Sequence, residues 1–179
     1  YPLLWDDMEV VRDNHYLRGD GSWWLFFRPD FWSKMMPISR ADYRPLQMVA
    51  LKTVSLVSGR SPVFFRLVNI CLHLGIAALV WMLGRRLFPE GPAALAGAAC
   101  FALHPVHVEA VINLRNIAEL VSSGLMLTVF IYFISGRRPA ARIVLACAGF
   151  AAALLFKEGA RLLPAVITSY LLFTAAGRE

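Results

Sequence analysis

Long apolar runs separated by short polar turns dominate the chain after residue 61. A helix needs about 20 mostly apolar residues to cross a bilayer. The first such run, residues 63–83, is predicted to end at Gly84-Arg85-Arg86. Four further apolar runs follow, over about residues 93–103, 118–134, 140–156 and 162–176. The pattern therefore predicts an all-α integral membrane protein, with about five transmembrane helices bundled over residues 62–179.

A polar segment rich in aromatic residues, residues 1–61, precedes the apolar runs. It holds half of the charged residues and four of the five tryptophans. Within it, residues 46–57 are apolar at helical spacing, but Gln47, Lys52 and Ser55 interrupt the apolar face. A helix of this kind is expected to lie in the membrane interface rather than to cross the bilayer. We therefore expect residues 1–61 to form an external loop with short juxtamembrane helices.

Composition and charge placement agree with a membrane protein. Hydrophobic residues make up 58% of the chain and charged residues 17%, with a mean hydropathy of +0.57, whereas soluble domains carry about 25% charge. The net charge is +6, and arginine pairs follow two apolar runs, at residues 85–86 and 137–138. Such pairs are typical of cytoplasmic helix ends, so they do not indicate a nucleic-acid partner. The same rule places residues 1–61, 104–117 and 157–158 on the external face.

Two adjacent carboxylates, Asp6 and Asp7, follow an apolar and aromatic stretch at the start of the chain. Burial beside apolar groups and a like-charged neighbour both raise the pKa of a carboxyl group, which suits a general base. The alternative is a solvated pair that caps a short helix over residues 8–12. Both interpretations stay open from the sequence.

Arg44 stands at the start of the predicted interfacial helix, directly before Pro45. Proline is favoured in the first turn of a helix, so Arg44 is expected at the level of the lipid head groups. A guanidinium there can bind a phosphate through two parallel hydrogen bonds. Arg44 is therefore a candidate ligand for a lipid phosphate, and an arginine that only extends toward the head groups is the alternative.

A second polar group lies where the second apolar run ends, in the sequence HPVHVE. His104, His107 and Glu109 can form hydrogen bonds with a ligand or with the polar segment, residues 1–61. The alternative is a divalent metal site with Asp7 as a further ligand. The two histidines, however, lack the four-residue spacing of zinc-binding helices.

Charged residues also flank the third and fourth apolar runs. Arg115 and Glu119 stand at the start of the third run, and Lys157 and Glu158 follow the fourth. A charge at membrane depth is costly unless it faces protein or a cavity, so we expect these residues to line a ligand site at the external face. A transporter would place such charges near the bilayer midplane instead.

Several segments, taken in order, resemble one known family. WDDMEVVRDN, YRPL, RLVNICLHL, HPVHVEAV and LLFKEGARLLP are similar in order and spacing to protein O-mannosyltransferases that combine membrane spans with tetratricopeptide repeats, and to their bacterial relatives. That family belongs to the GT-C membrane glycosyltransferases, which take a sugar from a polyprenyl-phosphate donor at the external or lumenal face. The resemblance implies a partial GT-C fold and covers only the N-terminal portion of such an enzyme, without its first helix.

The resemblance also implies roles for the charged residues. The catalytic base falls on the acidic pair at residues 6–7, and Arg44 falls in the motif that faces the lipid phosphate. The HPVHVEA segment and Glu119 fall near the donor, and residues 157–158 fall in the third external loop. The chain departs from the family at Ile117, because an arginine usually stands two residues before the acid.

These observations predict a glycosyltransferase that moves a mannose-like sugar from a polyprenyl phosphate to an acceptor hydroxyl, on a protein Ser or Thr or on a glycan. A single displacement predicts inversion, and cations at the site can stabilise the leaving phosphate without a metal. We expect the bacterial inner membrane, with the active face in the periplasm. The alternative is a non-catalytic GT-C-like scaffold or accessory subunit of a membrane complex. Convergence of the charged residues on one external cavity favours the enzyme.

Overall fold

The computed structural model describes residues 14–17, 19, 21–35, 43–89, 91–135 and 139–176. Every regular element among these residues is a helix, which confirms the all-α prediction. The first part of the chain forms η2 (His15–Leu17), η3 (Trp23–Phe27), α2 (Pro29–Met35) and α3 (Pro45–Ser58). The bundle consists of α4 (Pro62–Leu87), α5 (Ala93–Leu103), α7 (Ile117–Ile134), α8 (Pro139–Phe156) and α9 (Leu163–Ala176). Its connections contain η4 (Pro105–His107), α6 (Val108–Ile112), η5 (Leu114–Asn116) and η6 (Glu158–Leu162).

Two helices of the described part, Pro62–Leu87 and Leu114–Ile134, are long and apolar enough to cross a bilayer. A third span results if Ala93–Leu103 and Pro105–Ile112, which are bent by 46° at their junction, count as one broken helix. The last two helices, α8 and α9, lie within about one residue of the ranges predicted from the sequence. Both are shorter than the two long apolar helices, so whether they cross the bilayer stays a prediction, and with it the count of about five spans.

The predicted end of the first span at Gly84 is wrong. Helix α4 continues through Arg85 and Arg86 to Leu87. Arginine is a good helix former, and Gly84 serves close packing, because an added Cβ would lie 3.1 Å from Cβ of Ala94 in α5. A glycine in this position lets two membrane helices approach without ending either of them.

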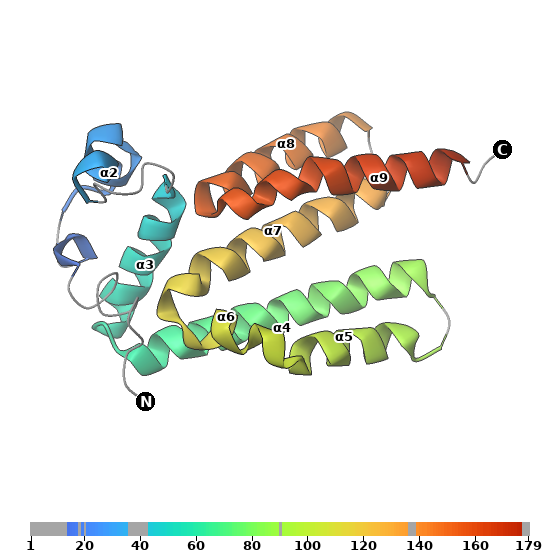
Figure 1. Cartoon of the computed structure of the whole chain (residues 1–179), viewed down its shortest axis with the longest axis horizontal. Coiled ribbons are helices and arrows are strands. Elements are labelled where there is room, and N and C mark those ends of the chain that lie inside the picture. Colours follow the sequence, from blue (N-terminus) through green and yellow to red (C-terminus); the bar gives the residue numbers. More distant parts are fainter. Residues whose placement is uncertain are drawn as a thin grey trace.

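The helices run alternately between the two ends of the bundle (Figure 1). The start of α4, the start of α7, the end of α8 and the start of α9 lie at the end where α3 crosses the bundle, and α6 leads from the end of α5 toward it. We call this the head end. The connection from α6 to α7 and the turn 157–162 therefore meet there, as the sequence predicts for one shared face. Arg85, Arg86 and Arg142 lie at the opposite end.

Three polar residues of α3 face protein rather than water. Gln47, Lys52 and Ser55 are all buried. The ammonium of Lys52 donates to the carbonyl of Gly21 and lies 5.0 Å from the ring centroid of Trp23. These contacts hold the aromatic segment that precedes α3, which we call the head, against α3. Beneath them is the main core cluster, which also draws on α4, η5 and α7 and contains Leu17, Phe26, Phe31, Met48, Leu51, Val54, Phe65, Leu114 and Ile117.

Two polar side chains of α4 fix the broken connection between α5 and α7. Asn69 is fully buried and its amide nitrogen donates to the carbonyls of Val111 and Asn113, at 3.2 and 2.9 Å. His73 Nε2 lies 3.1 Å from the carbonyl of Ala102. Backbone carbonyls that lose their helical partners at a break need other hydrogen-bond donors in a membrane. Asn69 supplies such donors and thereby also holds residues 113–116 at the head end.

Small residues bring α7 and α8 into close contact. Ser122 donates to the carbonyl of Ala153 at 3.1 Å. A Cβ added to Gly149 would overlap Cγ2 of Val129. Since valine keeps essentially one rotamer in a helix, Val129 cannot move aside easily. We expect Gly149→Ala to destabilise the fold by about 1–3 kcal/mol through overpacking, measured as a lower Tm in detergent micelles.

The matched control is Gly97→Ala in α5, where no described atom lies within 4 Å of an added Cβ. Because alanine favours a helix over glycine, this variant should keep or raise the Tm. Equal melting of the two variants would contradict the packing at Gly149.

Candidate functional site

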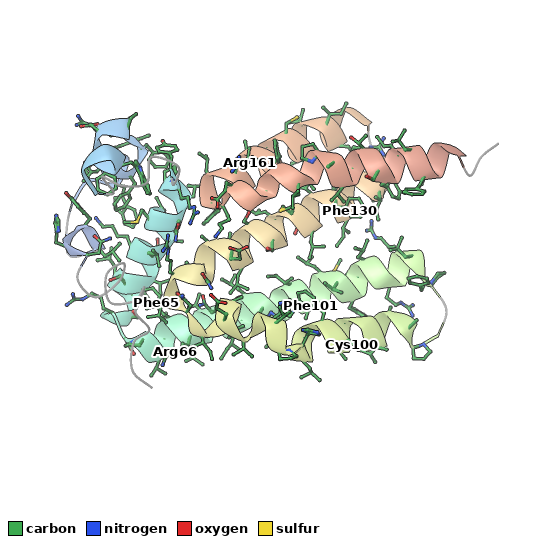
Figure 2. All side chains as sticks on the ribbon, viewed as in Figure 1. Phe65, Arg66, Cys100, Phe101, Phe130 and Arg161 are labelled. Atoms are coloured by element: carbon green, nitrogen blue, oxygen red, sulfur yellow. The ribbon has the colours of Figure 1, made fainter. Side chains whose placement is uncertain are left out.

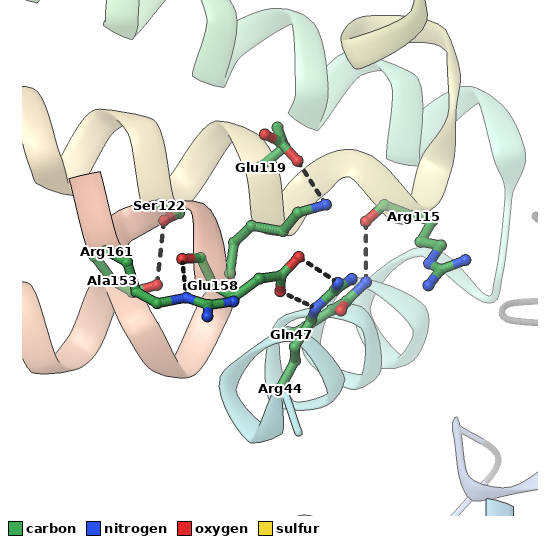
Figure 3. Close-up of polar contacts among 9 residues, drawn as sticks. Arg44, Gln47, Arg115, Glu119, Ser122, Ala153, Glu158 and Arg161 are labelled. Atoms are coloured by element: carbon green, nitrogen blue, oxygen red, sulfur yellow. Dashed lines mark hydrogen bonds and ion pairs between the residues drawn. The ribbon is translucent and has the colours of Figure 1, made fainter. Parts of the chain in front are cut away.

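Charged and polar residues from four segments line one cavity at the head end. This polar cavity has a volume of about 200 Å³ and is lined by Arg44, Gln47, Glu109, Asn113, Arg115, Asn116, Ala118, Glu119 and Lys157. It draws together α3, the connection between α5 and α7, the start of α7 and the turn after α8 (Figure 3). The structure thus brings together Arg44, Glu109, Arg115, Glu119 and Lys157, five of the residues singled out in the sequence.

Arg44 forms a two-pronged ion pair with Glu158. Its Nε and Nη2 donate to the two carboxylate oxygens, each at 2.8 Å (Figure 3). The Arg44 side chain is 9% exposed, whereas that of Glu158 is 37% exposed. A buried guanidinium needs such a partner, and the pair ties the start of α3 to η6. In this structure the two parallel hydrogen bonds that the sequence predicts from Arg44 to a lipid phosphate are instead made to the carboxylate of Glu158.

Glu158 stays ionised because of this environment. Burial on its own would raise the pKa of the carboxyl group. Hydrogen bonds from the backbone of Glu158 and from Arg44, with the positive charges of Arg44 and Lys157, together lower the pKa below its ordinary value of 4.5. The carboxylate is therefore charged over the physiological pH range.

A second ion pair joins the turn after α8 to the start of α7. Lys157 Nζ lies 2.8 Å from Oε2 of Glu119. Their side chains are 26% and 46% exposed, so this pair is more open to water than that of Arg44. The backbone N–H of Lys157 donates to the carbonyl of Ala153, which fixes where the flexible side chain begins.

The loop around Arg115 is held by amides. Asn113 Oδ1 accepts from the backbone N–H of Arg115 at 3.0 Å, and Gln47 Nε2 donates to the carbonyl of Arg115 at 3.3 Å. Sequence reasoning treated Gln47 only as an interruption of an apolar helix. The signal was its position, because Gln47 lies in the first turn of α3, three residues after the N-cap Arg44, and both line the polar cavity.

Ile117, where the resembling family carries an arginine, lies in the apolar core and is 3% exposed. A cation at this position would be buried among Leu114, Phe65 and their neighbours. Arg115, two residues earlier, lines the polar cavity instead.

An apolar groove of about 570 Å³ adjoins the polar cavity. It is lined mainly by apolar side chains of α4, α5, α7 and α9, among them Phe101 and Phe130, both labelled in Figure 2. His73 and His107 also face it, and Glu119 lines both the groove and the polar cavity. The polar cavity therefore meets an apolar surface that follows the membrane helices.

The ring of His107 packs at a tilt against two neighbouring rings. The ring centroid of His107 lies 4.3 Å from that of Phe101 and 5.2 Å from that of His73. His104 is exposed and its Nδ1 accepts from the backbone N–H of Val106. Within the part of the chain that the structure describes, no group of three His, Cys, Asp or Glu residues could hold a metal ion.

The acidic pair, Asp6 and Asp7, lies outside the described residues. Its role as a base, and its alternative role as a helix cap or a metal ligand, therefore remain predictions from the sequence.

The Arg44–Glu158 pair predicts a pH dependence of stability. Because the folded-state pKa of Glu158 is lowered, its contribution is present above the ordinary value and is lost as the pH falls through the lowered pKa. At about pH 7, Glu158→Gln should lower the stability by about 1–2 kcal/mol, less than for a fully buried pair because Glu158 is screened by water. Thermal unfolding of both proteins in detergent micelles across acidic pH measures this. A difference in Tm that stays constant down to pH values well below 4.5 would contradict the ion pair.

Residues 44–179 match the sequence profile of the family described as dolichyl-phosphate-mannose-protein mannosyltransferase. The chain is 30% identical over 144 residues to the protein O-mannosyl-transferase TMTC3 of Mus musculus, covering 79% of this chain and 16% of that protein. It is 32% identical over 166 residues to tmtc2 of Xenopus laevis, covering 87% and 20%, and 33% identical over 122 residues to Tmtc1 of Drosophila melanogaster, covering 67% and 14%.

No solved structure matches the chain. The chain spans a fifth or less of the length of these curated relatives. The match nevertheless covers most of the chain and confirms the resemblance found in the sequence motifs. With its apolar helices, the chain is an integral membrane protein that belongs to the dolichyl-phosphate-mannose-protein mannosyltransferase family.

Proposed function

We propose that this chain forms the donor-binding part of a membrane mannosyltransferase, which transfers mannose from a polyprenyl phosphate to a Ser or Thr hydroxyl of a protein. The observation that carries the proposal is the meeting of the polar cavity and the apolar groove at Glu119. The relatives from Mus musculus, Drosophila melanogaster and Xenopus laevis are named as protein O-mannosyl-transferases, which supports the sugar and the class of acceptor.

The two spaces suit the two parts of a lipid-linked sugar. A polyprenyl chain is apolar throughout, and the groove offers it aliphatic and aromatic side chains along the membrane helices. The phosphate and the sugar are polar, and the adjoining cavity offers Arg44, Arg115 and Lys157 with the amides of Gln47 and Asn116. A soluble sugar nucleotide would have no use for the groove, so the arrangement favours a lipid donor.

The transfer step needs a base and a stabilised leaving group. The proton of the acceptor hydroxyl passes to Asp6 or Asp7 as its oxygen attacks the anomeric carbon. The bond between this carbon and the phosphate oxygen breaks, and its electron pair stays on the phosphate. Arg44, Arg115 and Lys157 stabilise the charge that develops there. A single displacement of this kind inverts the anomeric configuration.

Three further residues of the HPVHVE segment are assigned to donor contacts. Glu109 lines the polar cavity, so its carboxylate can accept hydrogen bonds from hydroxyl groups of the sugar. His107 faces the groove and can form a hydrogen bond to the sugar or the phosphate. His104, which is exposed, is placed with them on the basis of the sequence motif. Glu158 acts through Arg44, whose guanidinium it orients.

The head end is proposed to face the outside of the membrane. Arg85, Arg86 and Arg142 lie at the opposite end, and an excess of arginine at short loops is typical of the cytoplasmic side. In a bacterial inner membrane the polar cavity would then open to the periplasm, where protein acceptors that have crossed the membrane are available.

A non-catalytic accessory subunit is the second candidate. The observation that favours it is that both Arg44 and Lys157 already have carboxylate partners in this structure, which leaves these cations balanced without a ligand. Such a subunit would use the ion pairs only to hold the head against the bundle.

The acidic pair provides the test. In membranes that contain the full-length protein, Asp6→Asn and Asp7→Asn are assayed for mannose transfer from a labelled polyprenyl-phosphate mannose to a peptide. Loss of the base should lower the rate by about 10²–10⁴-fold in one of the two variants. The anomeric configuration of the product, measured by NMR, should be opposite to that of the donor.

Asp30→Asn is the matched control, because Asp30 forms an exposed ion pair with Arg28 on the surface of the head and should keep the wild-type rate. If wild type and the three variants all insert normally and show no transfer with any donor offered, the result rejects the enzyme and favours the accessory subunit. Equal transfer by all four would exclude the acidic pair as the base.

A further inference from the structure

We propose that Glu119 is an internal substitute for the donor phosphate. Its carboxylate pairs with Lys157 while the site is empty, and an anionic head group must displace it to bind Lys157 at the junction of the polar cavity and the apolar groove. Glu119 thereby keeps Lys157 neutralised in the empty site and lowers the affinity for an anionic lipid, with no effect on the affinity for a neutral one. This inference rests on the proposed function and adds the residue that sets the affinity of its donor site for an anionic head group.

Position is the first argument. Among the described residues, Glu119 is the one side chain that lines both the polar cavity and the apolar groove. A lipid whose chain lies in the groove and whose head enters the cavity has its phosphate where these two spaces meet. The carboxylate of Glu119 thus stands where the negative charge of the lipid would be, and Lys157 Nζ is 2.8 Å from it.

Charge balance is the second argument. Three cations line the polar cavity, namely Arg44, Arg115 and Lys157, and two carboxylates line it with them. Glu158, bound to Arg44, adds the third carboxylate, so in the described part of the site the charges are equal in number. An additional anion is therefore accepted well only if one carboxylate gives up its cation.

The two ion pairs differ in how readily they open. Arg44 is nearly buried and held by two hydrogen bonds to Glu158, and breaking such a pair leaves a buried charge without a partner. Lys157 and Glu119 meet at Nζ and Oε2 and are both partly exposed, and ion pairs of this kind contribute little to stability. The ammonium of lysine on its flexible stem can also turn toward a new anion.

The displaced carboxylate keeps a favourable place. Glu119 is in the first turn of α7, where the helix dipole stabilises a negative charge. When the lipid leaves, Glu119 returns to Lys157, so the lysine is not left uncompensated at the membrane surface. The ion pair thus makes binding reversible at low cost.

The test measures equilibrium binding of a labelled polyprenyl phosphate to the full-length protein in detergent micelles. Glu119→Gln should lower the Kd by about two- to fivefold, the range that corresponds to the free energy of a partly exposed ion pair. Glu109→Gln removes one negative charge from the same cavity, whereas the ion pairs of Arg44 and Lys157 are formed with Glu158 and Glu119. It should therefore give a smaller gain.

A double-mutant cycle isolates the ion pair. In the Lys157→Gln background, Glu119→Gln should no longer improve binding, because no ammonium is released. A gain that persists there, or one no larger than that of Glu109→Gln, would overturn the inference. Melting curves show whether each variant folds as the wild type does.

Two further ligands test the role of the charge and of the lipid chain. Neutral polyprenol should bind wild type and Glu119→Gln equally, and a gain for polyprenol would overturn the role of charge. Inorganic phosphate should compete only weakly, and competition as strong as that of the lipid would assign the site to free phosphate instead. Mannose transfer in the same preparations separates the two proposals. Transfer without the binding gain refutes the Glu119 inference alone, and the binding gain without transfer refutes the proposed activity alone.

Discussion

The charge of a buried arginine must be balanced, and in this protein that requirement joins two distant segments. Arg44 and Glu158 are 114 positions apart in the chain and share two hydrogen bonds. The pair fixes α3 across the head end and holds η6, the turn between α8 and α9, against it. Because Lys157 precedes Glu158 directly, the same contact places the ammonium of Lys157 at the polar cavity. Removing the pair would weaken the contact between the start of α3 and η6.

A second constraint acts on the backbone inside the bundle. The chain breaks its helix after Leu103 and again at Asn113, which frees carbonyl groups that lipid cannot satisfy. Asn69 on the neighbouring helix supplies donors for two of them. The break brings Glu109 and Arg115 to the head end, so a local departure from helical geometry creates the wall of the polar cavity.

These two constraints explain why a polar cavity and an apolar groove can share a boundary. The groove follows the sides of regular membrane helices, whereas the cavity is built from helix ends and connections held by ion pairs and amides. Glu119 stands at the transition, in the first turn of α7. The family that the chain matches has a lipid-linked sugar, dolichyl-phosphate-mannose, in its name. A site that offers both environments agrees with this.

The sequence by itself determined the helical class, the bounds of α7, α8 and α9 within about one residue, and the meeting of the charged connections at one end. Apolar runs and alternating helix directions are local properties, so they can be read in order along the chain. The end of α4 was misjudged because the close approach of Gly84 to Ala94 involves another helix. Likewise, only the tertiary structure decided that Arg44 binds Glu158, that Lys157 binds Glu119 and that Gln47 holds the Arg115 loop, since each contact joins segments whose distance depends on how the whole bundle packs.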